Sequence, residues 1–199
     1  MCEMEIVLTR HGETIENVEG RFQGHLPGKL SEKGKEQAKK LAIRLKDEKF
    51  DYIFSSDLTR AADTAKEIKK FHQNTSIEFT KELRERNLGE FEGVRKSDLG
   101  LDPNKLVAGT IESKKGETQK EMYNRAKKFI NKLIKRFSDK RVLIVGHNGI
   151  NKVLTANILN KTFKEYEEIE PQLNCAVSIF ILNKNNPAEI KLWNCIKHL

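Results

Sequence analysis

Three consecutive residues near the start of the chain combine an anion-binding group with a nitrogen nucleophile. Arg10, His11 and Gly12 come one residue after the apolar run from Ile6 to Leu8. The guanidinium of an arginine is a planar fork of N–H donors that suits a phosphoryl group, and a neutral imidazole is a nucleophile near neutral pH. Gly12 has no side chain, so backbone or ligand can approach it closely. The triplet alone is a weak signal, and its weight depends on where the chain places it.

A second histidine stands in the same kind of position. His147, in Gly146-His-Asn-Gly149, follows a strand predicted over Arg141–Val145, and Arg60 follows another strand predicted over Asp51–Ser55. The carboxyl ends of parallel strands lie at one edge of a sheet, where open α/β sheets bind their ligands. We therefore expect two guanidiniums and two imidazoles to converge there and to form an oxyanion site.

Helical patterns separate the predicted strands. Ser31 is a suitable N-cap for a helix whose apolar residues continue to Leu45, and a further helix is expected to begin at Ser56-Asp57. Thr118 and Glu121 form a capping-box pattern at the start of the longest amphipathic helix. The remaining predicted elements are a loop over 13–30, a strand over 76–80, a helix after Gly149, and two antiparallel strands over about 176–182 and 189–194.

This alternation of strands and helices predicts an α/β fold. We expect a three-layer sandwich, in which a mostly parallel central sheet has helices on both faces. The pattern weakens between residues 81 and 116, where charged residues and glycines dominate and only a short helix around Lys105 is indicated. We interpret that stretch as a small inserted lid region within one domain that covers residues 1–199.

Composition limits the class of protein. Of the 199 residues, 37% are hydrophobic and 33% are charged, and no apolar run approaches the ~20 residues of a membrane span. The first residues have no signal-peptide pattern, so we expect a cytoplasmic protein that does not bind membranes. Three widely spaced cysteines indicate neither a disulfide framework nor a zinc site. A metal site made by His11, Glu13 and His147 is disfavoured, because their spacing matches no known ligand motif.

The net charge of +8 favours anionic partners. The lysines alternate with glutamates along the predicted helices, for example from Glu32 to Glu48, and such mixing is typical of a solvated helix face. We therefore expect a small anionic, phosphorylated substrate and no nucleic acid. A homodimer is left open.

Several motifs, taken together, resemble the histidine phosphatase superfamily, in the branch related to cofactor-dependent phosphoglycerate mutase and of the broad-specificity phosphatase type. The motifs follow the family's order over nearly the whole chain. They are Leu8–Thr14 with Asn17, Arg21–Gly24 with Leu30–Gly34, Ser55–Ala65, Leu83–Gly93, Gly116–Thr118 with Arg125, and Val145–Gly149.

The resemblance implies a role for each site residue. His11 would be the nucleophile that forms a phosphohistidine, and Glu85 would protonate the leaving group and then activate water. His147 would take part in catalysis, and the groups that hold the phosphoryl oxygens would be Arg10, Asn17, Arg60 and His147. Gln23 and Gly24 would contact the substrate, although the loop from Gly24 to Leu30 departs from the family pattern and leaves the substrate's identity open. Neither a cofactor nor a metal is implied, since cations on the phosphoryl oxygens can stabilise the transfer.

The residues around Glu85 pose a problem for its role. A glutamate that acts as an acid at neutral pH needs a raised pKa. Arg84 and Arg86 flank Glu85, and they would oppose that rise if their side chains pointed inward. The other three histidines, His25, His72 and His198, have no partner in sequence, and we expect them at the surface.

Three functions fit these residues. The first is a phosphomonoester hydrolase that releases inorganic phosphate. The second is a cofactor-dependent phosphoglycerate mutase, an isomerase that keeps its phosphohistidine away from water. The third is a catalytically idle module that binds phosphate. We favour the hydrolase, because no catalytic position is missing and the segment between Gly93 and Gly116 is short compared with the mutases.

Overall fold

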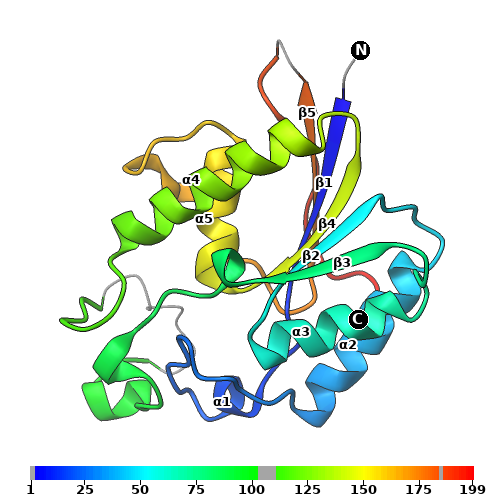
Figure 1. Ribbon diagram of the computed structural model, residues 1–199. Helices are drawn as coiled ribbons and strands as arrows, with labels where there is room; N and C mark the ends of the chain where they lie inside the picture. The colour runs from blue at the N-terminus through cyan, green and yellow to red at the C-terminus, as the bar shows by residue number, and fades with distance from the viewer. Residues whose placement is uncertain (1–2, 103–110, 184–185) are drawn as a thin grey trace.

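The computed structural model describes residues 3–102, 111–183 and 186–199, and these form one α/β sandwich around a six-stranded sheet (Figure 1). The strands are β1 (Glu3–Arg10), β2 (Tyr52–Ser56), β3 (Ser76–Thr80), β4 (Arg141–Gly146), β5 (Val177–Asn183) and β6 (Glu189–Cys195). The helices are α1 (Ile15–Val18), α2 (Glu32–Leu45), α3 (Thr59–Lys69), α4 (Gln119–Arg136) and α5 (Asn148–Ile158).

The sheet is mostly parallel, as the sequence predicted. Its strand order is β3-β2-β4-β1-β5-β6, and β5 runs antiparallel to both of its neighbours. The strands β1 and β4 lie side by side at the centre and consist of apolar runs, because both faces of the sheet are covered there. Their register pairs Arg10 with Gly146, so the residues that follow, His11 and His147, leave the sheet next to each other.

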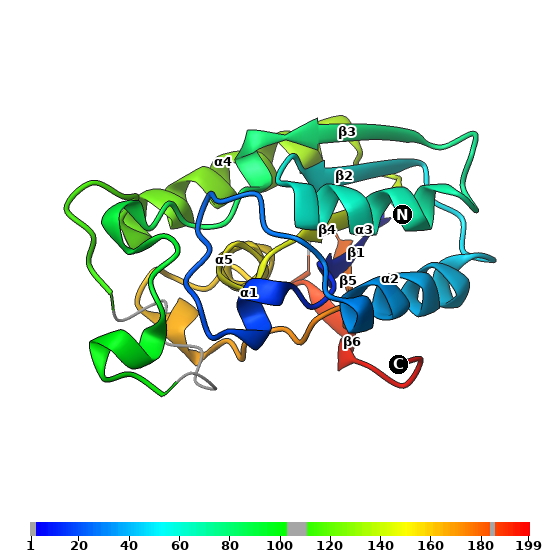
Figure 2. The same cartoon turned by 90° about the horizontal axis from the view of Figure 1, so that it is seen from below.

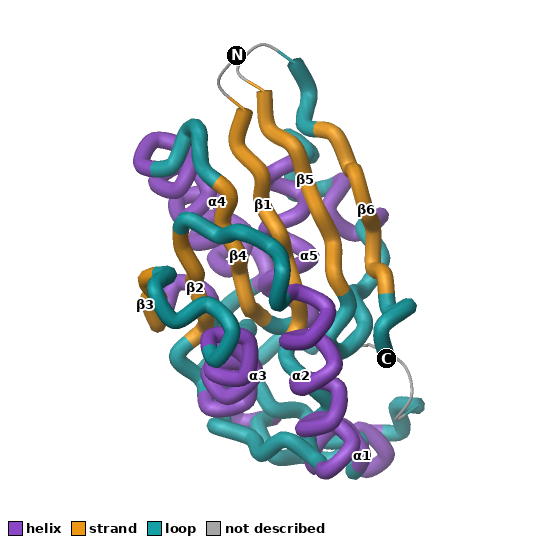
Figure 3. The backbone as a smooth tube through the Cα atoms, turned by 90° about the vertical axis from the view of Figure 1, so that its right-hand side faces the viewer, coloured by secondary structure: helices purple, strands orange, loops and turns teal. Residues whose placement is uncertain are grey.

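Helices cover both faces of the sheet (Figure 3). On one face, α4 and α5 pack on the side chains of Ile6, Leu8 and Ile144. On the other face, α2 and α3 pack on Val7 and Leu143. Successive β1 side chains thus enter the two cores in turn, which is the period-2 geometry of a strand.

Helix caps agree with the sequence prediction at two places. The Ser31 hydroxyl accepts a hydrogen bond from the Gly34 N–H at the start of α2, at 3.0 Å. Thr118 and Glu121 form the predicted capping box at the start of α4. The two final strands are antiparallel neighbours, as expected.

Two local predictions were wrong. Helix α3 begins at Thr59 and not at Ser56-Asp57, because β2 continues through Ser56 and the Asp57 carboxylate binds Arg84 instead of capping the helix. The predicted loop over 13–30 contains the single-turn helix α1, which Thr14 and Asn17 close with a capping box.

The segment over 81–116 has little regular structure where the structure describes it. It contains three 3-10 turns, at Lys81–Leu83, Gly89–Phe91 and Lys96–Leu99. The short helix expected around Lys105 lies outside the described residues. Among the described helices, none is both long and apolar enough to cross a membrane.

Candidate functional site

The candidate site lies at the carboxyl ends of β1, β2 and β4, below the sheet in Figure 1, and Figure 2 views the same end of the molecule directly. Helix α1 and the loops on either side of it lie in front of these strand ends in that view.

His11 is held in one orientation at the end of β1. Its Nδ1 lies 2.7 Å from the carbonyl oxygen of Gly12, and its own carbonyl accepts a hydrogen bond from the Asn174 side chain at 2.9 Å. A carbonyl oxygen only accepts, so Nδ1 carries the proton and Nε2 keeps its lone pair. The residue as a whole is 3% exposed. Burial, together with the charges of Arg60 and Arg10, lowers the pKa of His11 well below its usual value, so the imidazole is neutral at pH 7.

Gly12 is required by close packing. A Cβ atom at this position would lie 2.5 Å from the backbone carbonyl oxygen of Gly34, in the first turn of α2. The Gly12 N–H donates to the Thr64 hydroxyl of α3 at 3.1 Å. The turn after His11 is thus fixed against two helices at once.

His147 lies against His11, with the two ring centroids 5.0 Å apart and the rings edge to face. Its Nδ1 accepts a hydrogen bond from Arg60 Nε at 3.1 Å, which places the imidazole proton on Nε2. Nε2 is buried and has no hydrogen-bond partner among the described residues. Burial and the nearby Arg60 charge lower the pKa of His147 well below its usual value. The ring therefore holds one neutral, unsatisfied N–H donor beside His11.

Arg60 is almost completely buried, at 1% exposure, in the first turn of α3. Besides His147, it donates to the carbonyl oxygens of Leu26 at 2.5 Å and Pro27 at 3.4 Å through Nη1, and to that of Gly24 at 2.8 Å through Nη2. A guanidinium has five N–H groups, so one hydrogen on Nη2 is left over. Arg60 therefore supplies positive charge to the site and holds the loop after α1 through its carbonyl groups. Burial lowers its pKa to about 10, which leaves it protonated at neutral pH.

Arg10 is the second buried guanidinium. Its Nη1 donates to the Gln172 carbonyl oxygen at 3.0 Å, and its Nε is buried without a partner in the described part of the chain. Burial lowers its pKa to about 10, so the charge persists. Gln172 is itself anchored, because its side chain donates to the carbonyl oxygen of Leu8 and accepts from Asn151.

Glu85 lies at the N-terminus of α5, although it precedes Gly149 of that helix by 64 positions in sequence. Its carboxylate accepts hydrogen bonds from the N–H groups of Gly149 at 2.8 Å, Ile150 at 3.1 Å and Arg86 at 2.9 Å. Helix α5 has no capping bond from its own N-cap residue, His147. Glu85 therefore caps the helix from outside, where the helix dipole favours an anion.

The two arginines beside Glu85 behave differently. Arg84 turns away and pairs with the Asp57 carboxylate through Nε at 2.7 Å and Nη2 at 2.6 Å. Arg86 is nearly buried and donates to the carbonyl oxygen of Ile111 at 2.7 Å. The sequence raised the concern that both flanking arginines point toward Glu85 and oppose its protonation. Arg84 does not, because its guanidinium is paired with Asp57.

A cavity of about 80 Å³ brings most of the predicted site residues together. Those of its lining residues that the sequence singled out are Arg10, His11, Asn17, Gln23, Gly24, Arg60 and Glu85. His147 does not line the cavity, but its ring contacts the ring of His11, which does. The Asn17 amide oxygen is engaged by the Thr14 N–H, so its NH₂ group is the part available to an anion. The Gln23 amide oxygen is buried without a partner in the described structure.

Sequence reasoning missed several residues at this site. Lys96 and Asn148 also line the cavity, and burial together with the Arg10 charge lowers the pKa of Lys96. Gln172 and Asn174 hold Arg10 and His11 from behind. Asn148 could have been found, because it belongs to the Gly-His-Asn-Gly motif. No local pattern identifies the other three.

The three remaining histidines all have partners in the fold, and the prediction that they lie at the surface is wrong for His72 alone, since His25 and His198 are partly exposed. His25 donates through Nε2 to the Glu85 carbonyl oxygen at 2.9 Å. His72 is 7% exposed and packs edge to face on Phe50. His198 donates through Nε2 to the Cys175 carbonyl oxygen at 3.0 Å. His25 therefore joins the loop after α1 to the backbone of Glu85.

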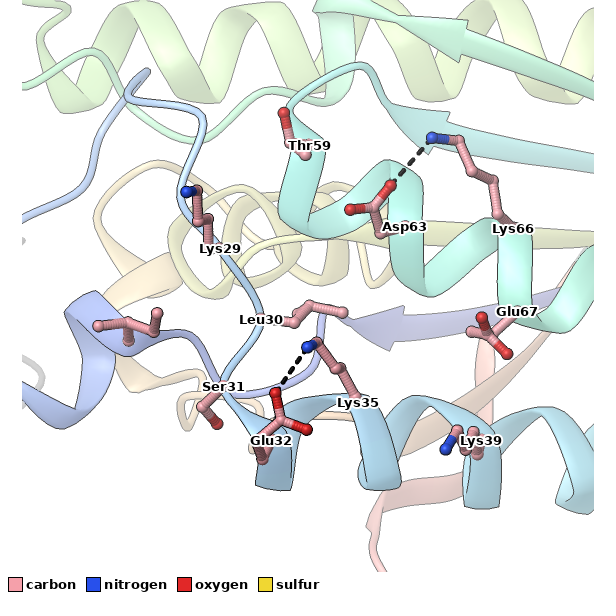
Figure 4. A pocket seen from close by; sticks show the side chains of 11 residues that line it. Lys29, Leu30, Ser31, Glu32, Lys35, Lys39, Thr59, Asp63, Lys66 and Glu67 are labelled. Carbon is pink, nitrogen blue, oxygen red and sulfur yellow. Dashed lines mark hydrogen bonds and ion pairs between the residues drawn. The ribbon is translucent and has the colours of Figure 1, made fainter.

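A larger hollow of about 640 Å³ lies between α2 and α3 and contains none of the site residues (Figure 4). Three of its four lysines are paired with acidic neighbours, namely Lys35 with Glu32 at 2.6 Å, Lys39 with Glu36 at 3.2 Å and Lys66 with Asp63 at 2.9 Å, and the fourth, Lys29, is exposed. This hollow offers no buried unpaired cation to an anion, so size alone does not mark the functional site. Among the described residues, no group of three or more histidine, cysteine or acidic residues is arranged to hold a metal ion.

Comparison with known proteins agrees with this geometry. Residues 6–196 match the family model of the histidine phosphatase superfamily, branch 1. The chain is 29% identical to phosphoglycerate mutase-like protein 4 of Arabidopsis thaliana, over 98% of this chain and 86% of that protein. It is also 29% identical to the metal-independent phosphoserine phosphatase of the same plant, over 98% and 83%. The structure of a mycobacterial glucosyl-3-phosphoglycerate phosphatase superimposes with a TM-score of 0.85 at 25% identity, over 98% of this chain and all of that one. The chain therefore belongs to branch 1 of the histidine phosphatase superfamily.

Proposed function

We propose that the protein is a metal-independent phosphomonoesterase that hydrolyses a small phosphorylated metabolite through a phosphohistidine on His11. The observation that carries the proposal is the state of His11. Its Nδ1–H is tied to the Gly12 carbonyl oxygen, its pKa is lowered, and the ring lines the same cavity as two buried guanidiniums. A lone pair on Nε2 is therefore available for attack at phosphorus.

The first step transfers the phosphoryl group to the protein. The Nε2 lone pair of His11 forms a bond to phosphorus while the bond from phosphorus to the leaving oxygen breaks, and Glu85 gives its proton to that oxygen. Arg10 and Arg60 supply positive charge for the phosphoryl oxygens, and the unsatisfied His147 Nε2–H is a further donor.

The second step returns the histidine to its starting state. Glu85, now a carboxylate, takes a proton from a water molecule, whose oxygen attacks phosphorus as the bond from phosphorus to Nε2 breaks. Inorganic phosphate and a protonated Glu85 remain, so protons and charge balance over the cycle. The N–H groups of Gly149 and Ile150 keep the carboxylate in one place for both proton transfers.

The name of the relative "metal-independent phosphoserine phosphatase" supports the absence of a metal requirement. The relative named phosphoglycerate mutase-like protein 4 keeps a mutase activity as the second candidate. The two functions differ in the fate of the phosphoenzyme, because a hydrolase passes its phosphoryl group to water and a mutase returns it to a phosphoglycerate. We favour hydrolysis, since the stretch between Gly93 and Gly116, within the segment over 81–116 that we treat as a lid, is short compared with the mutases.

Phosphate release from a panel of phosphomonoesters tests the proposal. The panel should include phosphoserine, sugar phosphates, 3-phosphoglycerate, α-ribazole phosphate and p-nitrophenyl phosphate, with His11→Ala as the inactive control. We expect phosphate release from at least one ester and no conversion of 3-phosphoglycerate to its isomer. Isomerisation that outpaces phosphate release would replace the hydrolase with the mutase, and release unchanged in His11→Ala would refute the mechanism.

Replacement of Glu85 tests its role separately. Glu85→Gln keeps the shape of the side chain but cannot transfer a proton, so kcat on an alkyl phosphate should fall by ~10²–10⁴. p-Nitrophenolate is a stable leaving group, so the first-step burst with p-nitrophenyl phosphate should fall clearly less. Equal losses with both esters would limit Glu85 to positioning the substrate.

A further inference from the structure

Arg125, on α4, binds the backbone of the segment that carries Glu85. Arg125 donates through Nη1 to the carbonyl oxygens of Glu82 at 2.7 Å and Arg84 at 2.9 Å, and through Nη2 to that of Glu85 at 3.4 Å. Three carbonyl groups within four residues thus point at one guanidinium. Without Arg125, the carbonyl groups of Glu82 and Arg84 would depend on water for these hydrogen bonds.

Glu117 binds the same guanidinium, and we refer to Arg125 and Glu117 together as the clamp. Its carboxylate binds Arg125 in a two-pronged ion pair, with distances of 2.8 Å to Nε and 2.6 Å to Nη2, and both side chains are about one-fifth exposed. The backbone N–H of Glu117 donates to the Asn87 carbonyl oxygen at 2.8 Å. The pair therefore fastens both ends of the short stretch around Glu85 to the start of α4.

The position of Glu85 is fixed at two points as a result. Arg125 and His25 hold its carbonyl oxygen, while the first turn of α5 holds its carboxylate. Arg125 does not line the cavity that contains His11, and its five N–H groups are all directed to Glu117 and to the three carbonyl oxygens, so none is left for a phosphoryl group. Any effect of Arg125 on the reaction must pass through the backbone that it holds.

We propose that Arg125, oriented by Glu117, is the positioning residue for the proton transfers of Glu85, and that it acts on the leaving-group step without binding substrate. The inference rests on the proposed function, because it presumes that Glu85 is the acid. Displacement of a catalytic group by about 1 Å can cost ~10²-fold in rate. Loss of the clamp should therefore lower kcat on alkyl phosphates and leave substrate affinity nearly unchanged.

The test compares Arg125→Gln with Arg125→Lys and Glu117→Gln. We expect Arg125→Gln to lower kcat on an alkyl phosphate by ~10–100-fold, with KM and the affinity for orthovanadate changed less than about twofold. The p-nitrophenyl phosphate burst should be nearly unaffected. Arg125→Lys keeps the charge and some donors, so it should recover part of the lost rate.

A matched control lies on the same helix. Lys132 pairs with the Glu82 side chain at 2.8 Å, so it joins α4 to the same segment without touching its carbonyl groups. Lys132→Gln should leave kcat unchanged on both esters. If Lys132→Gln lowered kcat as much as Arg125→Gln does, any contact between α4 and this segment would be enough to support catalysis. That result would overturn a specific role for Arg125.

A double-mutant cycle with Glu85→Gln decides the route of the effect. If Arg125 acts through Glu85, Arg125→Gln should cause no further loss in the Glu85→Gln background. A further loss there, or equal losses on alkyl and aryl esters, would overturn the inference and leave the proposed function intact. If Glu85→Gln itself shows no leaving-group dependence, the acid role of Glu85 fails, and the inference fails with it.

Discussion

Gly149 offers a way to move the Glu85 carboxylate without changing Glu85. A Cβ atom at Gly149 would lie 2.4 Å from Glu85 Oε1. Ordinary contact needs ~3.5 Å, so Gly149→Ala should push the carboxylate away by about 1 Å. The φ angle of Gly149 is not in the left-handed region, and its backbone already belongs to α5, so alanine fits the local conformation.

The expected effect is catalytic and not destabilising. Alanine raises helix propensity by up to about 1 kcal/mol, which offsets the weakened contacts of Glu85 with the helix N-terminus. The free energy of unfolding should therefore stay within about 1 kcal/mol of the original protein. A shift of about 1 Å in a catalytic group costs ~10²-fold, so kcat on an alkyl phosphate should fall by that factor.

The assay pairs steady-state turnover of an alkyl phosphate with the p-nitrophenyl phosphate burst, and thermal unfolding reports the stability. In the Glu85→Gln background the same glycine change should have no further effect on the alkyl ester. Full alkyl phosphatase activity in Gly149→Ala, or an equal loss in the burst, would refute the placement of Glu85 as the proton donor.

Other consequences follow from the buried cations and imidazoles. Activity should survive EDTA, because Arg10 and Arg60 already supply the positive charge, and restoration of lost activity by a divalent ion would contradict this. The pKa values of His11 and His147 are lowered in the folded protein. Above pH ~6.5 neither the folded nor the unfolded protein binds these protons, whereas just below it only the unfolded protein does. The free energy of unfolding should therefore decrease as the pH is lowered, by up to about 1.4 kcal/mol per pH unit for each histidine. Urea unfolding between pH 7 and 5 measures this slope, and asparagine at both positions should flatten it. Gly12→Ala should destabilise the fold by ~1–3 kcal/mol through its contact with the Gly34 carbonyl oxygen, and an unchanged midpoint would argue against that packing.

The layout of the site could be predicted from local patterns. The apolar runs before His11 and His147 are typical of buried parallel strands, and parallel strands end at one edge. The pairing of Arg10 with Gly146 confirms that the two histidines leave neighbouring strands together. Arg60 could be placed because it follows a third strand, although the start of its helix was predicted three residues early.

The supporting contacts could not be predicted, because they depend on tertiary packing. Glu85 caps a helix that is far away in sequence, so no capping pattern reveals it. Arg60 gives most of its donors to loop carbonyl groups, whereas its sequence context suggested phosphate alone. Gln172 and Asn174 support Arg10 and His11 from a segment without periodicity. These two residues have their roles because their segment passes next to the carboxyl end of β1 in the folded protein.

The phosphoenzyme is the most direct test of the central claim. The wild-type protein should be mixed with a ³²P-labelled substrate and quenched rapidly without acid. We expect a labelled adduct that is labile in acid and stable in base, with phosphorus on Nε2 of His11, since Nδ1–H is bound to the Gly12 carbonyl oxygen. The adduct should be absent from His11→Ala. Label retained in that variant, an acid-stable adduct, or phosphorus on Nδ1 would contradict the account.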